Sequence, residues 1–217
     1  MAKATLKLVE SDKVIEKRIN KSLASEINKA LDKASTKLIV PVKTLVKDAI
    51  FNQPEVFSLS GGKLAAEFGL PDGRRRISDI IDVWVNGLIV TKKKAVPKQG
   101  QLTAGLTIKM IPRDFADVLR LPQGTIVTEK GQELPWLEWL IKFGDRTIVK
   151  DYSVNFDRNK SRRSRSGFAI MQGSKGSTWK VPPEFAGTEE NNFVTRALKT
   201  IDEDLMLLIE KQLKSVI

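Results

Sequence analysis

The sequence predicts an α+β fold in which long N- and C-terminal helices pack on a small antiparallel β-sheet with an extended basic hairpin. Three observations predict it. Apolar residues recur every three or four positions at both ends of the chain, which is the spacing of one helix face. Short stretches between the ends alternate apolar and polar residues, as half-buried strands do. A segment rich in Arg and Ser separates two strand-like stretches.

The first predicted helix covers residues 11–52. Its apolar stripe consists of Ile15, Ile19, Leu23, Ile27, Leu31, Ala34, Leu38, Val42, Leu45 and Ala49. Pro41 interrupts this pattern, and proline lacks the amide hydrogen that a helix interior needs, so we expect either a kink or two consecutive helices. The opposite face is rich in lysine, which fits a solvated surface or contact with an anionic partner. We divide the chain into a helical segment, residues 1–53, and an α+β body, residues 54–217, on which the helix packs as part of one compact domain.

The middle of the chain predicts short elements. We expect a helical piece around residues 63–68 and a helix over residues 77–88, although the β-prone runs Val83–Val85 and Leu88–Val90 make a strand the alternative there. Residues 92–100 begin with three lysines and are expected to form an exposed loop. Alternating residues predict short strands at 106–110 and 125–128.

The last third predicts a helix, a hairpin and a final helix. Pro135 suits the first turn of a helix, and Gly144 could end it in the left-handed conformation. Residues 146–156 and 167–171 are expected to be strands flanking the Arg- and Ser-rich segment. Thr188 is the predicted N-cap of a long amphipathic helix that continues to Val216.

The composition argues against catalysis. The 217 residues include no Cys and no His, which excludes disulfides, thiol and imidazole catalysis and most zinc sites. Asp145, Lys150 and Asp151 loosely resemble an acidic cluster, but no third metal ligand is evident. We therefore expect no enzyme, no cofactor and no bound metal. No stretch has the length and apolarity of a membrane span, so no membrane partner is expected. The net charge of +11 favours polyanionic partners.

Two groups of residues are the candidates for function. Residues 157–167, here called the basic loop, could be a solvated hairpin tip or could contact DNA or an acidic protein. Its cations are Arg158, Lys160, Arg162, Arg163 and Arg165. Arg and Ser both contact phosphate without reading sequence. The candidate core or interface anchors are Trp136, Trp139, Phe143 and Phe193, since aromatic side chains contribute large apolar areas and are enriched at interfaces.

Two motifs resemble those of tail-completion and neck proteins of long-tailed bacteriophages, including the minor tail protein Z group. Residues 139–144, Trp-Leu-Ile-Lys-Phe-Gly, resemble the end of the aromatic helix of that group, with Lys142 where Glu is frequent. Residues 192–198, Asn-Phe-Val-Thr-Arg-Ala-Leu, resemble the start of its last helix, with Thr195 and Arg196 in place of an Arg-Pro pair. The similarity covers residues 102–213 and, more loosely, residues 23–46.

The resemblance implies a structural virion protein without catalytic residues. Subunits would form a ring, six-fold by analogy, that completes the tail tube and joins it to the head. Its neighbours would be the connector or head-closure protein and the tail-tube or sheath protein. The protein would be made in the host cytoplasm and located in the neck or tail of the virion. The basic loop would then contact either a neighbouring ring or genomic DNA in transit. The alternative function is a stand-alone, sequence-nonspecific nucleic-acid-binding protein.

Overall fold

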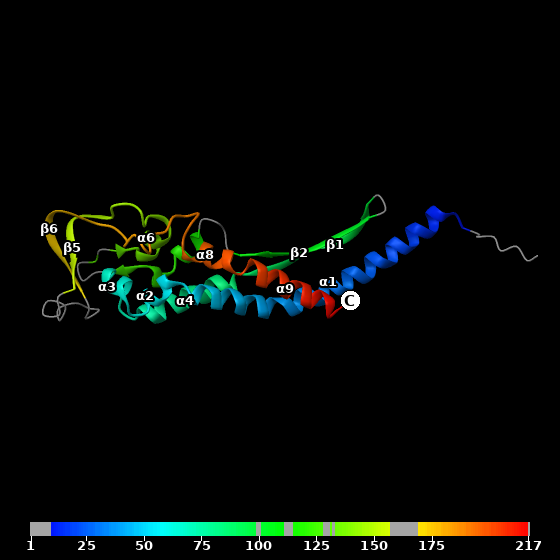
Figure 1. Cartoon of the computed structure of the whole chain (residues 1–217), viewed down its shortest axis with the longest axis horizontal. Helices are drawn as coiled ribbons and strands as arrows, with labels where there is room; N and C mark the ends of the chain where they lie inside the picture. The colour runs from blue at the N-terminus through cyan, green and yellow to red at the C-terminus, as the bar shows by residue number, and fades with distance from the viewer. Residues whose placement is uncertain are drawn as a thin grey trace, which may run out of the picture. The chain divides into compact units, whose positions relative to one another are not determined.

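The structure, a computed structural model, describes residues 10–98, 101–110, 115–127, 131, 133–156 and 169–216. It confirms the α+β class, with a long N-terminal helix and small antiparallel strand pairs (Figure 1). Contacts within the chain define two compact units. Unit 1 comprises Met1–Pro41, Ile89–Lys109 and Leu207–Ile217, and unit 2 comprises Val42–Leu88 and Met110–Met206.

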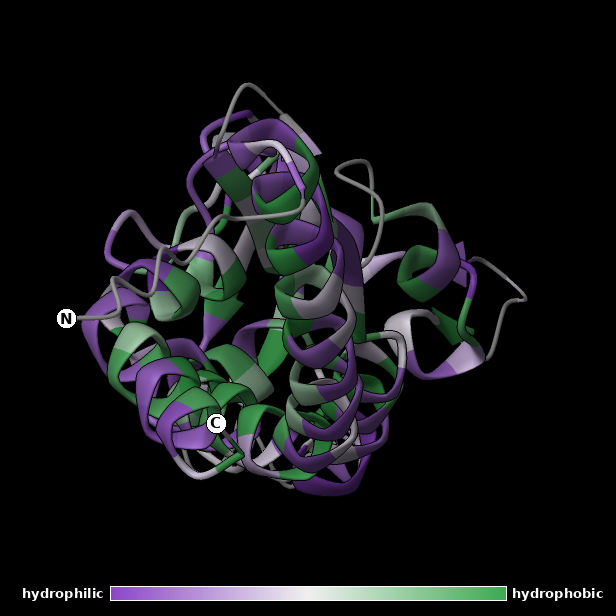
Figure 2. Ribbon diagram, turned by 90° about the vertical axis from the view of Figure 1, so that its right-hand side faces the viewer, coloured by the Kyte–Doolittle hydropathy of each residue, from purple (hydrophilic) through white to green (hydrophobic). Residues whose placement is uncertain are grey.

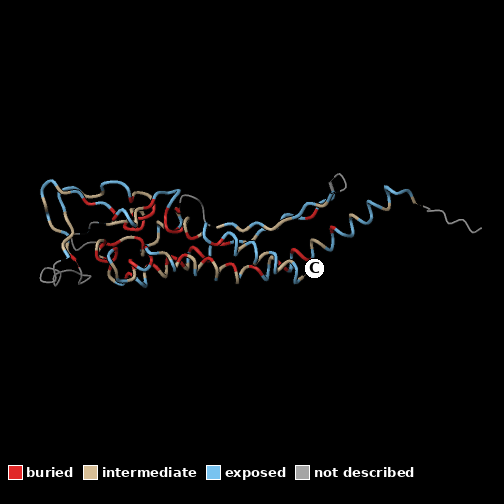
Figure 3. Tube along the Cα trace, in the orientation of Figure 1, coloured by how far each residue is buried: buried red, intermediate tan, exposed pale blue. Residues whose placement is uncertain are grey.

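Helix α1 spans Asp12–Phe51 without a break, and Pro41 lies inside it. The alternative of two consecutive helices separated at Pro41 is therefore wrong. The boundary between the two units falls directly after this proline. The stripe of α1 that is buried includes Leu31, Leu38 and Val46, but no residue from Asp12 to Leu23 is buried (Figure 3).

Three helices follow α1 in unit 2. They are α2 (Pro54–Leu59), α3 (Lys63–Glu67) and α4 (Gly73–Asn86). The helix predicted over residues 77–88 is thus confirmed as far as Asn86, and the alternative strand is wrong over Val83–Val85 but correct from Ile89, where a strand begins. The reason for the helix is the helical spacing of four apolar residues, which occupy one face of α4 and have no exposed surface. They are Ile77, Ile80, Ile81 and Trp84.

A two-stranded antiparallel ribbon belongs to unit 1. Strand β1 (Ile89–Lys98) pairs with β2 (Gln101–Lys109) in a register that runs from Ile89↔Lys109 to Lys98↔Gln101, with an irregularity between Lys93 and Val96. The loop predicted from Lys92 onward is therefore wrong up to Lys98. Its lysines are exposed as expected, but exposure does not distinguish a loop from a ribbon that is solvated on much of both faces.

The rest of unit 2 contains short elements, and those at residues 116–119, 122–124 and 133–134 were not predicted from the sequence. The elements are α5 (Ala116–Leu119), the 3₁₀ helix η1 (Pro122–Gly124), β3 (Ile126–Val127), β4 (Glu133–Leu134), α6 (Trp136–Lys142), β5 (Val149–Asn155) and β6 (Ile170–Trp179). Strands β5 and β6 pair antiparallel, as predicted for the two sides of the basic loop. Among the described residues, the strands form three separate pairs and no larger sheet.

The C-terminal helix is divided in two. Helix α8 (Phe193–Thr200) ends at Ile201, and α9 (Asp202–Lys214) begins directly afterwards. The prediction of one long helix with a continuous buried stripe is wrong, because the buried positions of the segment stop at Ile201 and α9 has none. The helices of the chain carry both hydrophobic and hydrophilic residues along their length, as the green and purple segments of Figure 2 show.

The two units differ greatly in their cores. Unit 2 buries large side chains, among them Trp84, Trp136, Phe193, Ile80 and Leu137. The buried apolar residues described in unit 1 are mostly small: Ala24, Ala30, Leu31, Ala34, Leu38 and Ala95. Since burial of apolar area is the main stabilising term, unit 1 gains far less from its own packing than unit 2 does.

Candidate interaction surfaces

Helix α6, which carries Trp136 and Trp139, packs into an aromatic cluster of unit 2. Trp136 has no exposed surface, and its ring lies 6.0 Å from that of Phe68 in α3's C-cap position. Trp139 is partly exposed and lies 6.5 Å from Phe68 and 6.0 Å from Trp179. Both predicted anchors therefore contact residues from distant parts of the sequence within one chain.

The polar atoms of this cluster also have partners. Trp136 donates its indole N–H to the backbone oxygen of Gln123 at 3.0 Å, and Trp179 donates to Glu67 at 2.6 Å. A buried indole without such an acceptor would lose its hydrogen bond to water. The cluster thus holds α3, η1, α6 and the end of β6 together, which is a structural role.

The other two predicted anchors lie in different surroundings. Phe193 is buried, and its ring meets that of Trp84 edge-on at 5.7 Å, with Phe115 on Trp84 at 6.4 Å. Phe143 is partly exposed, and the guanidinium of Arg146 stacks over its ring at 5.0 Å. Phe143 therefore does not join either aromatic cluster.

Gly144 follows the end of α6 and its C-cap Phe143, and the structure requires a glycine there for a reason that the sequence did not suggest. Among the described residues it is not one of the glycines with positive φ, so the predicted left-handed stop is wrong. Its N–H donates to the oxygen of Gly187 at 3.1 Å, and a Cβ at Gly144 would lie 2.5 Å from the nitrogen of Gly187. Two backbone segments touch here, and only a glycine leaves room for them.

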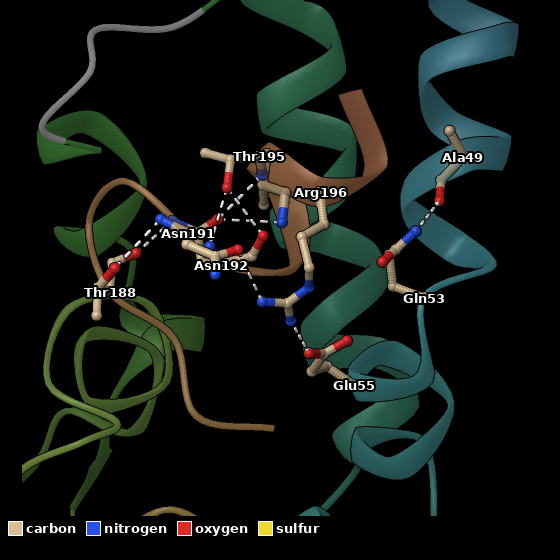
Figure 4. Close-up of polar contacts among 9 residues, drawn as sticks. Ala49, Gln53, Glu55, Thr188, Asn191, Asn192, Thr195 and Arg196 are labelled. Atoms are coloured by element: carbon tan, nitrogen blue, oxygen red, sulfur yellow. Dashed lines mark hydrogen bonds and ion pairs between the residues drawn. The ribbon is translucent and has the colours of Figure 1, made fainter. Parts of the chain in front are cut away.

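Asn192 caps α8, so the prediction that Thr188 is the cap is wrong (Figure 4). The side-chain oxygen of Asn192 accepts from the backbone N–H groups of Val194 and Thr195, both at 3.1 Å, and Thr195 Oγ1 accepts from the N–H of Asn192 at 2.9 Å. This reciprocal arrangement satisfies donors that the first helical turn leaves free. Thr188 lies one turn earlier and receives the amide of Asn192 on its backbone oxygen at 3.0 Å.

Glu55 is a buried carboxylate that sequence reasoning missed. It lies in α2 with no exposed surface and accepts a hydrogen bond from Arg196 of α8 (Figure 4). Its second oxygen, Oε2, has no hydrogen-bond partner among the described residues. Burial raises the pKa of Glu55 above its usual value, and the positive charge of Arg196 offsets only part of this effect. No local signal in the sequence marks a glutamate for burial.

The basic loop lies outside the described residues. Its five candidate cations, Arg158, Lys160, Arg162, Arg163 and Arg165, fall within residues 157–168. The strands that flank it are described, and Phe156, the last described residue before it, is 47% exposed.

Helix α9 and the start of α1 carry apolar side chains that are exposed or only partly covered. None of the thirteen residues of α9 is buried, although six of them are large and apolar: Leu205, Met206, Leu207, Leu208, Ile209 and Leu213. Met206 and Leu207 are 68% and 63% exposed. On α1, Val14, Ile19 and Leu23 are also exposed.

A second apolar area, here called the phenylalanine surface, lies on unit 2. It comprises Phe51, Phe57, Phe156 and Phe185, which line two neighbouring surface hollows that share Gly62 and Lys63. Phe57 is 83% exposed, which is unusual for a ring of this size. Beside it, Lys63 and Glu184 form an ion pair at 2.5 Å.

The described residues offer no cluster of acidic side chains suited to a metal ion, and no described helix is long and apolar enough to cross a membrane. Comparisons of this chain with protein-family models, with curated proteins and with solved structures find no match.

Proposed function

We propose that this protein is a structural subunit of a tailed bacteriophage that assembles into a ring at the neck and completes the tail tube for joining to the head. The number of subunits proposed, six, comes from the resemblance of residues 139–144 and 192–198 to the tail-completion group. The neighbours proposed are the head-side connector and the tail tube or sheath. A virion location is part of the same proposal.

The observation that carries the proposal is the exposure of α9. A helix of thirteen residues is marginal in water by itself, and most helical stability in proteins comes from packing of its apolar side. In α9 two adjacent apolar side chains, Met206 and Leu207, are 68% and 63% exposed, and none of its other residues is buried. Contiguous exposed apolar side chains mark interaction sites on soluble proteins. Association with further copies through α9 would cover them, and a closed ring would do so for every subunit.

The phenylalanine surface supports a second contact, with a neighbouring virion protein. Aromatic side chains in or beside surface hollows are typical of the residues that dominate binding energy at interfaces. An adaptor needs both kinds of surface, one for its own copies and one for the next component. The motifs that carry the resemblance belong to the scaffold, since they form the end of α6 and the cap and first turns of α8.

The first experiment measures assembly. Light scattering gives the mass of the protein alone and after addition of purified tail tubes, and negative-stain imaging gives the shape. Rings in either condition are expected. A protein that stays monomeric at all concentrations and ignores tail tubes would overturn the proposal.

A pair of variants then tests the role of α9. Met206→Ser with Leu207→Ser should weaken assembly at least tenfold while leaving the circular dichroism of the monomer unchanged. The matched control is Val40→Ser with Ile89→Ser, at positions that are 68% and 53% exposed. The control should assemble like the wild type. Equal losses in the two variants would show that apolar exposure in general, and not α9, drives association.

A further inference from the structure

The net charge of the protein is concentrated in unit 1. Unit 1 contains 16 Lys and Arg and 6 Asp and Glu, a formal net charge of +10, whereas unit 2 contains 21 and 20, a net charge of +1. The basic loop belongs to the sequence range of unit 2, where the Asp and Glu residues of the unit as a whole balance its charge in the total. The fold therefore gathers the excess charge on the unit that has the thinnest core.

The β1–β2 ribbon has the least balanced charge of the unit. Residues 89–109 include five lysines and no Asp or Glu. One of these lysines is used internally, because Lys92 forms an ion pair with Asp32 of α1. Asn28 of α1 also exchanges hydrogen bonds with the backbone of Ala95, accepting from its N–H at 2.8 Å and donating to its oxygen at 3.4 Å. These contacts fasten β1 to α1.

Other lysines of the ribbon remain available for a partner. Lys93, Lys94 and Lys109 are exposed and make no ion pair with a residue that the structure describes. Lys93 faces Gly105 in the register, and the position of a Cβ on Gly105 has no neighbour within 4 Å, so nothing covers Lys93 from across the ribbon. Exposed Thr103 and Thr107 add hydroxyl groups to the same ribbon.

The residue types favour phosphate over an acidic protein surface. Of the 16 cations in unit 1, 15 are Lys and one is Arg, and the unit contains no Phe, Trp or Tyr. Lysine is depleted at protein–protein interfaces, where aromatic residues and Arg are enriched. Lysine and threonine are common partners of nucleic-acid phosphates. The absence of aromatic rings also removes the platforms on which the bases of single strands stack.

We propose that the β1–β2 ribbon of unit 1 binds the phosphate backbone of duplex DNA without regard to sequence. A two-stranded ribbon is narrow enough to enter the major groove. With only a few lysines on each chain, the contact is weak per subunit and strongly dependent on salt. This proposal does not require a ring, although several copies side by side would strengthen the contact.

The test is a salt titration of binding to a short fluorescent duplex of arbitrary sequence. Lys93→Gln, Lys94→Gln and Lys109→Gln are combined in one variant, which keeps the Lys92–Asp32 ion pair. Each phosphate contact contributes about 0.9 to the slope of log K against log salt, so the slope should fall by about 3. At about 50 mM salt the affinity should fall at least tenfold.

The control removes the same charge from unit 2. Lys175, Lys180 and Lys199 are exposed, and changing all three to Gln should alter the slope little. Equal effects of the two variants would show a response to net charge alone and would overturn the proposal. Unchanged binding by the ribbon variant, or loss of binding only when the five cations of the basic loop become Gln, would also overturn it.

Two further probes identify the partner class. A single strand of the same sequence should bind more weakly than the duplex, and polyglutamate of equal charge should compete poorly. Stronger binding to either probe would overturn the assignment to duplex DNA. Because the ribbon variant retains α9, its assembly into rings should be normal, so failure of DNA binding and failure of assembly are measured separately.

Discussion

Arg196 of α8 donates a hydrogen bond to the carboxylate of Glu55 in α2, 141 positions earlier in the chain, and that carboxylate has no exposed surface. The arginine itself is one-third exposed at its side chain. The pair therefore joins α2 to α8 within unit 2, with one charge in the interior and the other at its edge.

Replacing Arg196 alone should lower the free energy of unfolding more than replacing both Arg196 and Glu55. Arg196→Met leaves a buried carboxylate without its positive partner and is expected to lower the free energy of unfolding by about 3 kcal/mol at neutral pH. Adding Glu55→Met should recover most of that loss, because two apolar side chains bury no charge that needs an oppositely charged partner. Urea denaturation of the three proteins measures both values. A double variant as unstable as Arg196→Met would contradict this account.

The raised pKa of Glu55 predicts the direction of a pH effect. The folded protein holds the proton of Glu55 at a pH where the unfolded chain, near the ordinary value of 4.5, has released it. The stability that protonation of Glu55 contributes is fully present below pH 4.5 and is lost as the pH rises through the pKa that Glu55 has in the folded protein. Glu55→Gln cannot titrate, so its stability should improve relative to the wild type as pH rises to neutral.

Glu184 is the control for that pH effect. A hydrogen bond from Lys63 holds the pKa of this exposed carboxyl below its usual value, so its small contribution is present above that value and is lost as pH falls. Glu184→Gln should therefore show the opposite trend, measured as the same series of urea transitions. Parallel curves for wild type and Glu55→Gln at every pH would rule out the effect.

The contact between Gly144 and Gly187 should tolerate no side chain. In Gly144→Ala the new Cβ would meet the nitrogen of Gly187 at 2.5 Å and Cα of Ala186 at 2.8 Å. Backbone atoms cannot rotate away, so we expect a loss of about 2–3 kcal/mol, measured by thermal or urea denaturation. Gly173→Ala in β6 is the matched change, since nothing lies within 4 Å of its Cβ position. It should be neutral or slightly stabilising.

The cap of α8 can be assigned by two alanine substitutions. Asn192→Ala removes the acceptor of two amide hydrogens and should cost about 1–2 kcal/mol. Thr188→Ala should cost less than about 0.5 kcal/mol, because its interaction with Asn192 uses the backbone and its Oγ1 loses only one exposed hydrogen bond, from the N–H of Asn191 at 3.2 Å. A larger loss of stability for Thr188→Ala than for Asn192→Ala, measured by chemical denaturation, would favour Thr188 as the cap, as the sequence predicted.

The sequence predicted elements whose evidence is local. Helical spacing identified α1 and α4, the flanks of the basic loop identified β5 and β6, and Pro135 marked the start of α6. Predictions failed where several local arrangements satisfy the same residues. A lysine-rich stretch can be a loop or a solvated ribbon, Thr188 and Asn192 are both good caps, and Gly144 suits both a left-handed turn and a close backbone approach.

The sequence by itself determined the α+β class, the absence of Cys and His chemistry, and the positive net charge, since these follow from composition and short-range periodicity. Only the tertiary structure decided that Glu55 is buried against Arg196, that no residue of α9 is buried, and that the excess charge lies on unit 1 instead of the unit holding the basic loop. Burial and charge clustering depend on which distant segments fold together. That is a property of long-range contacts, which the pattern along the chain does not contain.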